Sequence, residues 1–272
     1  MTGVHARRRG REQGGLGMLR RLAFIGGGVV AGAGIAMVPA ALVSTIYGET
    51  STALAIGGAA AITVVCGWLA WRVFGSQGEL TTKEGFGAVG VAWFVMSAFG
   101  TLPYLLSGAI PGITDAFFET ASGFTTTGAS IVPEPHFLPK GILFWRSTTQ
   151  WIGGMGIIVL SIAVLPLLGV GGVQLARAES PGPTPDRLTP RFQETAKRLW
   201  ILYVGFTAVE ALLLSLGDMD VFQAVNHAFT TLSTGGFGTE HTSISGFSPY
   251  SQWVITVFMF LAGASFALHF RA

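Results

Sequence analysis

Two segments of similar character decide the fold of this chain: AFFETASGFTTTGAS at residues 116–130 and VFQAVNHAFTTLSTGGFG at residues 221–238. Each begins with about ten mostly apolar residues, which form a short helix but are too few to cross a hydrocarbon core of about 30 Å. Each then ends in a run rich in Thr and Gly, at residues 125–130 and 233–238. The chain therefore contains an internal repeat, in which Gly236 follows Gly128 by 108 positions.

Longer apolar stretches surround both segments. The chain is 50% hydrophobic and 11% charged, whereas soluble globular chains carry about 25% charged residues. A stretch of about 20 apolar residues crosses a bilayer as a helix. We therefore predict an all-α integral membrane protein with six transmembrane helices, at residues 22–47, 53–71, 86–114, 142–171, 199–216 and 250–270.

The basic residues indicate the orientation. All but two of the 16 Lys and Arg residues fall on one side of the membrane if the six spans alternate, the exceptions being Lys140 and Arg146. The positive-inside rule makes that side cytoplasmic. The sequence thus predicts a multi-pass protein of the cell (inner) membrane with a cytoplasmic N-terminus and both Thr/Gly runs near the outer side. Topology explains the Arg-rich start, so no nucleic-acid partner is expected.

The repeat consists of a span, a short helix, a Thr/Gly loop and a second span. A Thr/Gly run can also be an ordinary exposed turn. Two such runs, each placed between spans on the same side, favour re-entrant pore helices, because non-helical backbone at membrane depth needs protein or a watery cavity around it. The predicted organisation is a basic cytoplasmic tail, an N-terminal transmembrane hairpin, a first repeat, a cytoplasmic linker and a second repeat, at residues 1–21, 22–85, 86–176, 177–197 and 198–272.

Such loops have the chemistry of an ion filter. Backbone carbonyls can replace the hydration shell of a potassium ion, and glycine allows the positive φ that such a row requires. Neither loop contains an acid, but the partially negative C-terminal end of each short helix would favour a cation. The candidate ion-binding residues are Thr126, Thr127, Gly128, Ala129, Thr234, Gly235, Gly236 and Phe237.

These runs also resemble a known family. SGFTTTGA at residues 122–129 and STGGF at 233–237 are similar to the first two filter loops of the Trk/Ktr/HKT superfamily of potassium transporters. WRS at 145–147 followed by TQWIGGMG at 149–156 resembles the helix after the first filter. RAESPGP at 177–183, together with TAK at 195–197, looks like the cytoplasmic connection of the TrkH branch.

The resemblance implies the pore-forming subunit of a potassium uptake system, with four repeats around one axis. It also implies a homodimer, a cytosolic nucleotide-binding regulatory subunit of the TrkA type, and potassium as substrate without a cofactor. Only two repeats are present here, which predicts a truncated copy that does not conduct by itself. Two alternatives stay open: an accessory, non-conducting membrane subunit, and a homodimer that shares one pore. No Ser/His/Asp set, zinc-spaced cluster or Walker motif occurs, so no enzyme is expected.

Four further features have interpretations of their own. The glycines of the first span, among them Gly27 and Gly34, predict close helix packing rather than a dinucleotide site. Asn226 and His227 are expected to form hydrogen bonds behind the second filter. Arg146 is expected to extend outward or to pair with an acid such as Glu119. Glu210, an acid within a span, is either functional or interfacial.

Overall fold

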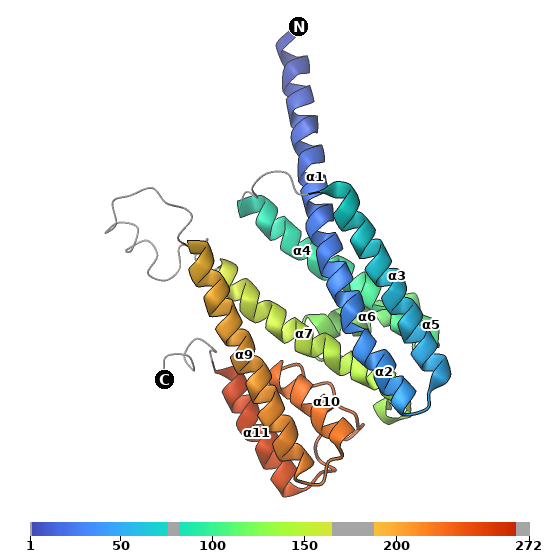
Figure 1. Ribbon diagram of the computed structural model, residues 1–272. Coiled ribbons are helices and arrows are strands. Elements are labelled where there is room, and N and C mark those ends of the chain that lie inside the picture. The colour runs from blue at the N-terminus through green and yellow to red at the C-terminus, as the bar shows by residue number, and fades with distance from the viewer. Residues whose placement is uncertain (1, 76–81, 165–187, 265–272) are drawn as a thin grey trace, which may run out of the picture. The chain divides into compact units, whose positions relative to one another are not determined.

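The structure is a computed structural model, which describes residues 2–75, 82–164 and 188–264 (Figure 1). These residues form helices joined by loops, in the order α1 (Thr2–Ala36), α2 (Val38–Ile46), α3 (Thr50–Phe74), α4 (Thr82–Gly100), α5 (Leu102–Ser107), α6 (Ile113–Phe124), the 3-10 turn η1 (Pro135–Phe137), α7 (Lys140–Val164), α9 (Leu188–Ser215), α10 (Val221–Leu232) and α11 (Pro249–Gly263). The predicted linker at 177–197 and the ends of two predicted spans lie partly outside the described residues.

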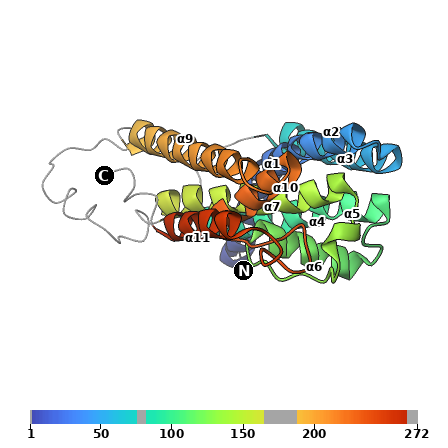
Figure 2. The same ribbon diagram turned by 90° about the horizontal axis from the view of Figure 1, so that it is seen from below.

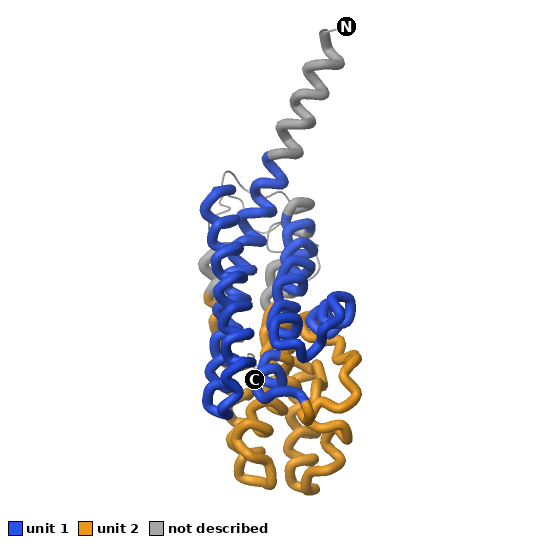
Figure 3. Tube along the Cα trace, turned by 90° about the vertical axis from the view of Figure 1, so that its right-hand side faces the viewer, with its two compact units in different colours: residues 1–121, 138–145 blue, residues 122–137, 146–272 orange. Residues whose placement is uncertain are grey.

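The chain divides into two compact units (Figure 3). Unit 1 comprises residues 1–121 and 138–145, and unit 2 comprises residues 122–137 and 146–272. Unit 1 thus holds α1 to α5, most of α6 and the start of α7. Unit 2 holds both Thr/Gly loops, the rest of α7, and α9 to α11, so the whole candidate filter lies in one unit.

Glycines bring the helices of unit 1 into close contact. α1 packs against α3 and α4. A Cβ at Gly27 would come within 2.6 Å of the Trp71 backbone nitrogen, and one at Gly34 within 2.8 Å of the Val64 nitrogen. Small residues allow such a backbone approach in membrane helices, where lipid supplies no hydrophobic driving force. The packing prediction is therefore confirmed at Gly27 and Gly34.

Two prolines break predicted single spans into pairs of helices. α1 ends before Met37 and α2 follows with Pro39 in its first turn; α4 ends before Thr101 and α5 follows with Pro103 in its first turn. Proline removes a hydrogen-bond donor and clashes with the preceding turn, but it is tolerated at a helix start. The third predicted span, 86–114, extends past the C-terminal end of the observed helix, because α5 stops at Ser107.

Four segments are long and apolar enough to cross a membrane among the residues described: Gly17–Ile46, Thr50–Phe74, Gly87–Ser107 and Glu194–Ser215. They correspond to the first, second, third and fifth predicted spans. The other two predicted spans begin in α7 and α11 and continue past the described residues. Large apolar side chains such as Leu54, Ile35 and Trp68 are exposed on these helices, as expected for surfaces that face lipid.

Polar contacts fix the start of α7 within unit 1. The Glu49 carboxylate accepts hydrogen bonds from the backbone nitrogens of Lys140, at 2.6 Å, and Gly141, at 3.2 Å. These nitrogens belong to the first turn of α7, whose N–H groups have no partner inside the helix. The Trp145 indole nitrogen donates to the carbonyl of Gly100 at the end of α4, at 3.0 Å. Glu49 therefore has a structural role as a cap of α7.

The core of unit 2 joins α7, α9, α10 and α11. One cluster of buried side chains brings together Met155, Tyr203, Leu232, Phe258 and Ala262. A second cluster contains Leu214, Met219, Ala224 and Ile255. Figure 2 shows the C-terminal half of α7 between α9 and α11. These clusters anchor the short helix α10, which leads into the second loop.

Capping residues define the short helices of unit 2. Asp220 begins α10 in a capping box with Gln223, in which each side chain bonds to the other residue's backbone nitrogen. Asp218 accepts hydrogen bonds from the backbone nitrogen and hydroxyl of Ser248, the residue that caps α11. Asp220 therefore caps α10 directly, and Asp218 holds the residue that caps α11.

Candidate functional site

The two Thr/Gly loops leave their short helices in the same way. After α6, the Thr126 nitrogen donates to the Gly123 carbonyl and the Thr127 nitrogen to the Ser122 carbonyl, both at 3.0 Å. After α10, the Thr234 and Gly235 nitrogens make the corresponding bonds to Thr231 and Thr230, both at 2.9 Å. This pattern is a Schellman motif, which ends a helix at a residue of left-handed conformation. The internal repeat inferred from the sequence is thus present in the backbone.

The left-handed residue in each loop is a threonine. Thr126 has a φ of 55° and Thr234 a φ of 56°, and two positions later Gly128 and Gly236 have φ of 76° and 78°. Glycine adopts such angles easily, but for a β-branched residue they are rare and strained. Strain of this kind costs on the order of 1–3 kcal/mol and persists where the surrounding structure imposes it, often at functional sites.

The two loops meet through their backbones. A Cβ at Gly128 would overlap the carbonyl oxygen of Gly235, so only glycine fits at this crossing. In the first loop, Thr127 and Ala129 are exposed, and the hydroxyls of Thr125 and Thr127 lie 2.9 Å apart. In the second loop, Thr234 and Gly236 are exposed, whereas Gly235 and Phe237 are buried. The predicted filter residues of both loops therefore form one continuous site.

One face of α7 supports both loops. Gln150 is fully buried, and its Oε1 accepts a hydrogen bond from the Phe237 nitrogen at 3.0 Å. A Cβ at Gly235 would overlap the Gln150 amide, which therefore lies directly against the second loop. One turn earlier, the Arg146 guanidinium donates to the Gly238 carbonyl at 3.3 Å and to the Ser130 hydroxyl at 3.1 Å. Ser130 and Gly238 are themselves equivalent positions of the two loops.

Arg146 also stacks on the second loop. Its guanidinium carbon lies 4.3 Å from the centre of the Phe237 ring, a cation–π geometry. The side chain is only 2% exposed. The expectation that Arg146 extends outward is therefore wrong, because the loops offer it a carbonyl, a hydroxyl and an aromatic ring. The alternative, a pairing with Glu119, stays a prediction.

Small residues bring α7 close to the starts of the loops. A Cβ at Gly153 would overlap the Phe124 carbonyl oxygen, and one at Gly154 would come within 2.8 Å of the Ser233 Cα. Gly153 and Gly154 continue the face that carries Arg146 and Gln150, because helical residues three, four and seven positions apart share a face. α7 therefore contacts each loop along its length.

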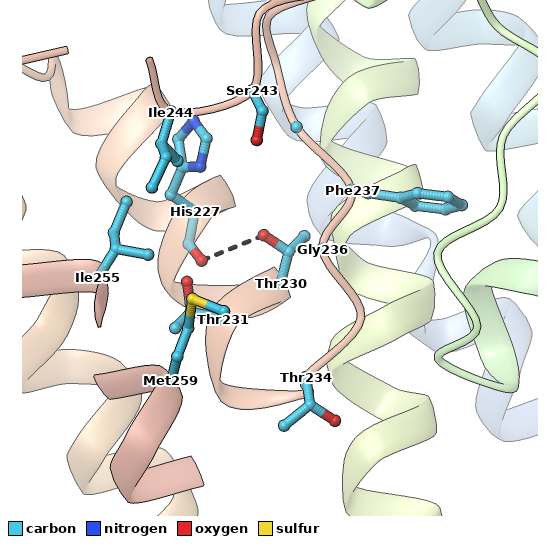
Figure 4. Close-up of a pocket in the computed structure, with 11 residues that line it drawn as sticks. His227, Thr230, Thr231, Thr234, Gly236, Phe237, Ser243, Ile244, Ile255 and Met259 are labelled. Carbon is cyan, nitrogen blue, oxygen red and sulfur yellow. Dashed lines mark hydrogen bonds between the residues drawn. The ribbon is translucent and has the colours of Figure 1, made fainter. Parts of the chain in front are cut away.

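A cavity of about 370 Å³ lies on the far side of the second loop (Figure 4). Thr234, Gly236 and Gly238 of the loop line it, opposite Ile255 and Met259 of α11. The Phe237 ring points away from the cavity in Figure 4. In contrast to Gly128, Gly236 has open space where a Cβ would be: apart from its chain neighbours, no described residue has an atom within 4 Å of that position. The two loops are thus alike in backbone conformation but not in surroundings.

Two polar residues of α10 form hydrogen bonds, His227 outside its helix and Asn226 within it. The His227 Nε2 lies 3.3 Å from the hydroxyl of Thr239, just after the second loop. The Asn226 side chain donates to the Phe222 carbonyl of its own helix at 2.7 Å. The contact of His227 agrees with its predicted hydrogen bonding behind the second loop, whereas the bond of Asn226 stays within α10, so the role of Asn226 stays a prediction. Glu210 of α9 is fully buried inside the protein.

Arg146 and Gln150 were not among the predicted site residues. Their sequence signal is two polar side chains one turn apart in a stretch otherwise suited to a membrane span. Polar residues in such stretches are rare and usually functional. Spacing alone does not show which loop they contact. The first loop is separated from α7 by a turn, and the second loop is distant from α7 in the sequence.

Comparisons with known proteins agree with this geometry. Residues 51–272 match the TrkH family model, described as a cation transport protein. The Trk system potassium uptake protein TrkH of Escherichia coli K12 is 48% identical over 204 residues, which cover 74% of this chain and 42% of that protein. TrkH of Halomonas elongata is 42% identical over 245 residues, covering 88% of this chain and 50% of that protein.

A solved structure shares the fold. The crystal structure of the potassium transporter TrkH from Vibrio parahaemolyticus has a TM-score of 0.81 and 36% sequence identity, and the match covers 93% of this chain and 51% of that one. The chain thus spans about half the length of the relatives it matches. The family match extends over most of the chain and includes both filter-like loops, so the chain belongs to the TrkH family of cation transport proteins.

Proposed function

We propose that this chain contributes two walls of a potassium-conducting filter, as the pore-forming subunit of a Trk-type uptake system. The observation that carries the proposal is the repeated backbone of residues 125–130 and 233–238, with left-handed Thr and Gly at equivalent positions and a direct contact between Gly128 and Gly235. Consecutive backbone carbonyls can replace an ion's hydration shell. The relatives that match are named potassium uptake proteins.

The electrostatics of the loops favour a cation. Each loop follows the C-terminal end of a 12-residue helix, α6 or α10. That end of a helix is partially negative because its carbonyl groups have no intrahelical partner. A 12-residue helix is about 18 Å long, too short to cross the membrane. We propose that α6 and α10 are re-entrant pore helices, and that potassium binds at Thr126, Thr127, Gly128, Ala129, Thr234, Gly235, Gly236 and Phe237.

The remaining assignments follow from this proposal. We propose six spans with the N-terminus in the cytoplasm. We also propose that the chain is divided into an N-terminal hairpin and two repeats. Potassium is the substrate, and no cofactor takes part. A homodimer and a cytosolic nucleotide-binding subunit of the TrkA type are the proposed partners, in the inner membrane of the cell.

A second candidate, a membrane subunit that does not conduct by itself, is favoured by the surroundings of Gly236. Gly236 has open space where a Cβ would be, and the opposite wall of the cavity next to it includes Ile255 and Met259 of α11, whose side chains offer no oxygen to an ion. An ion held by two walls needs further oxygens on its other sides, because unsatisfied polar groups in hydrocarbon cost several kcal/mol each.

Rubidium uptake into liposomes that contain the purified chain tests both candidates. We expect Gly128→Asp and Gly236→Asp to abolish any uptake, because each adds a side chain at a left-handed filter position. Gly32→Ala is the matched control, since a Cβ at this helical glycine would meet no atom of another described segment within 4 Å. Equal uptake by all variants at equal incorporation would refute the ion pathway. Absence of uptake by the unmodified chain would favour the non-conducting subunit.

A further inference from the structure

The buried amide of Gln150 lies against one loop and close to the other. Its Oε1 accepts from the Phe237 nitrogen at 3.0 Å, which fixes the orientation of the amide because that nitrogen can only donate. Its Nε2 is close to both loops, 2.7 Å from the position of a Cβ at Gly235 in the second loop and 3.9 Å from the position of a Cβ at Gly128 in the first. This nitrogen is buried and has no hydrogen-bond partner among the described residues.

A buried donor without a partner is costly and requires an explanation. The groups that could accept from it are oxygens, and carbonyl oxygens and ion-bound water are what a filter between these loops would contain. A side chain that is bonded to the second loop and carries a donor close to both loops can transmit the state of one loop to the other. Gln150 is well placed for this, because α7 is anchored at several levels along both loops by Arg146, Gly153 and Gly154.

We propose that Gln150 is a positioning residue that sets the spacing of the two loops and thereby the preference for potassium over sodium. The cage for a dehydrated ion depends on the distance between its walls, and Gln150 contacts the second loop at both Gly235 and Phe237. Its free Nε2 would donate to an oxygen of the first loop, or to water, when the cation is bound. This inference rests on the proposed function, because it assigns a role within the same site.

Hydrogen exchange of the purified chain, measured in potassium, sodium and choline salts, tests the inference. In the unmodified chain we expect slower exchange at residues 125–130 and 233–238 in potassium than in sodium. Gln150→Leu removes both the acceptor and the donor, and should accelerate exchange in both loops on the order of tenfold while removing the difference between the two cations. Gln150→Glu keeps the acceptor for the Phe237 nitrogen and should restore most of the protection of the second loop.

Two further variants keep the test decisive. Gln150→Asn retains the amide but is shorter by one methylene, so its amide should not reach the loops and exchange in both loops should accelerate. This variant provides the test if Gln150→Leu fails to fold. Gln252→Leu is the matched control, since Gln252 donates to the Phe247 carbonyl at the start of α11, away from both loops. It should leave exchange in the loops unchanged.

The outcomes separate the two proposals. No difference between potassium, sodium and choline in the unmodified chain would contradict the proposed ion site. Faster exchange in both loops of Gln150→Asn, even in choline, would then still support the coupling of the loops by Gln150. If exchange in Gln150→Asn accelerated only at residues 233–238, or nowhere, the inference would be overturned. It would also be overturned if the difference in exchange between potassium and sodium were the same in Gln150→Asn as in the unmodified chain.

Discussion

Alanine substitutions at the two filter glycines should have unequal effects, although the glycines occupy equivalent positions. Gly128 has a φ of 76° and Gly236 a φ of 78°, so a Cβ at either position carries the penalty of left-handed backbone, roughly 1–2 kcal/mol. Only at Gly128 would the Cβ also overlap another part of the chain, the carbonyl of Gly235. Overpacking of this kind costs roughly a further 1–3 kcal/mol.

The predicted totals are therefore about 1–2 kcal/mol for Gly236→Ala and about 2–5 kcal/mol for Gly128→Ala. In a chain of this size each kcal/mol lowers the unfolding midpoint by about 2–4 °C. Thermal unfolding of the purified chain, followed by tryptophan fluorescence, should show a decrease of a few degrees for Gly236→Ala and about twice as much or more for Gly128→Ala. Gly32→Ala should cause no decrease, because alanine is favoured over glycine in a helix.

The ranking of the two variants is the critical result. Equal decreases would mean that the close contact between Gly128 and Gly235 does not exist in the folded chain. A larger decrease for Gly236→Ala would mean that the space beside Gly236 is filled, and would contradict the asymmetry between the loops on which the non-conducting alternative depends.

Two further predictions concern the ends of helices and the topology. Hydrogen bonds from Ser248 and Ser251 lower the pKa of the exposed Asp218 carboxyl from 3.8 to about 2, so its stabilising contribution is complete above pH 3.8 and is lost as the pH falls through 2. Asp218→Asn should thus lower the unfolding midpoint slightly at pH 6, and the difference from the unmodified chain should disappear near pH 2; a difference that is constant with pH would refute the role of the charge. Reporter fusions after Glu134 and Thr242 should report an external location and a fusion near Gly182 a cytoplasmic one, because the basic residues segregate to one side; a cytoplasmic location at Glu134 would exclude the re-entrant arrangement.

The sequence by itself determined the class of fold and the positions of the two loops that we propose as the filter. Apolar length identifies membrane helices from composition alone, and the Thr/Gly runs at 125–130 and 233–238 mark the loops because glycine has a direct effect on the local backbone. The predicted short helices correspond to α6 and α10, which are somewhat longer than expected at one end each. These inferences succeeded because they depend on interactions between neighbours in the chain.

The tertiary structure decided what surrounds the loops. The contact between Gly128 and Gly235, the hydrogen bonds of Arg146 to both loops and the hydrogen bond of Gln150 to the second loop join residues that are not neighbours in the sequence. No periodicity or composition encodes such pairs, and a polar residue in an apolar helix has many possible partners. The left-handed conformation of Thr126 and Thr234 was equally unpredictable, because their local preference opposes it and only the packed surroundings impose it. Local chemistry thus specified which residues form the two Thr/Gly loops, whereas packing against α7 specified how the two loops face each other.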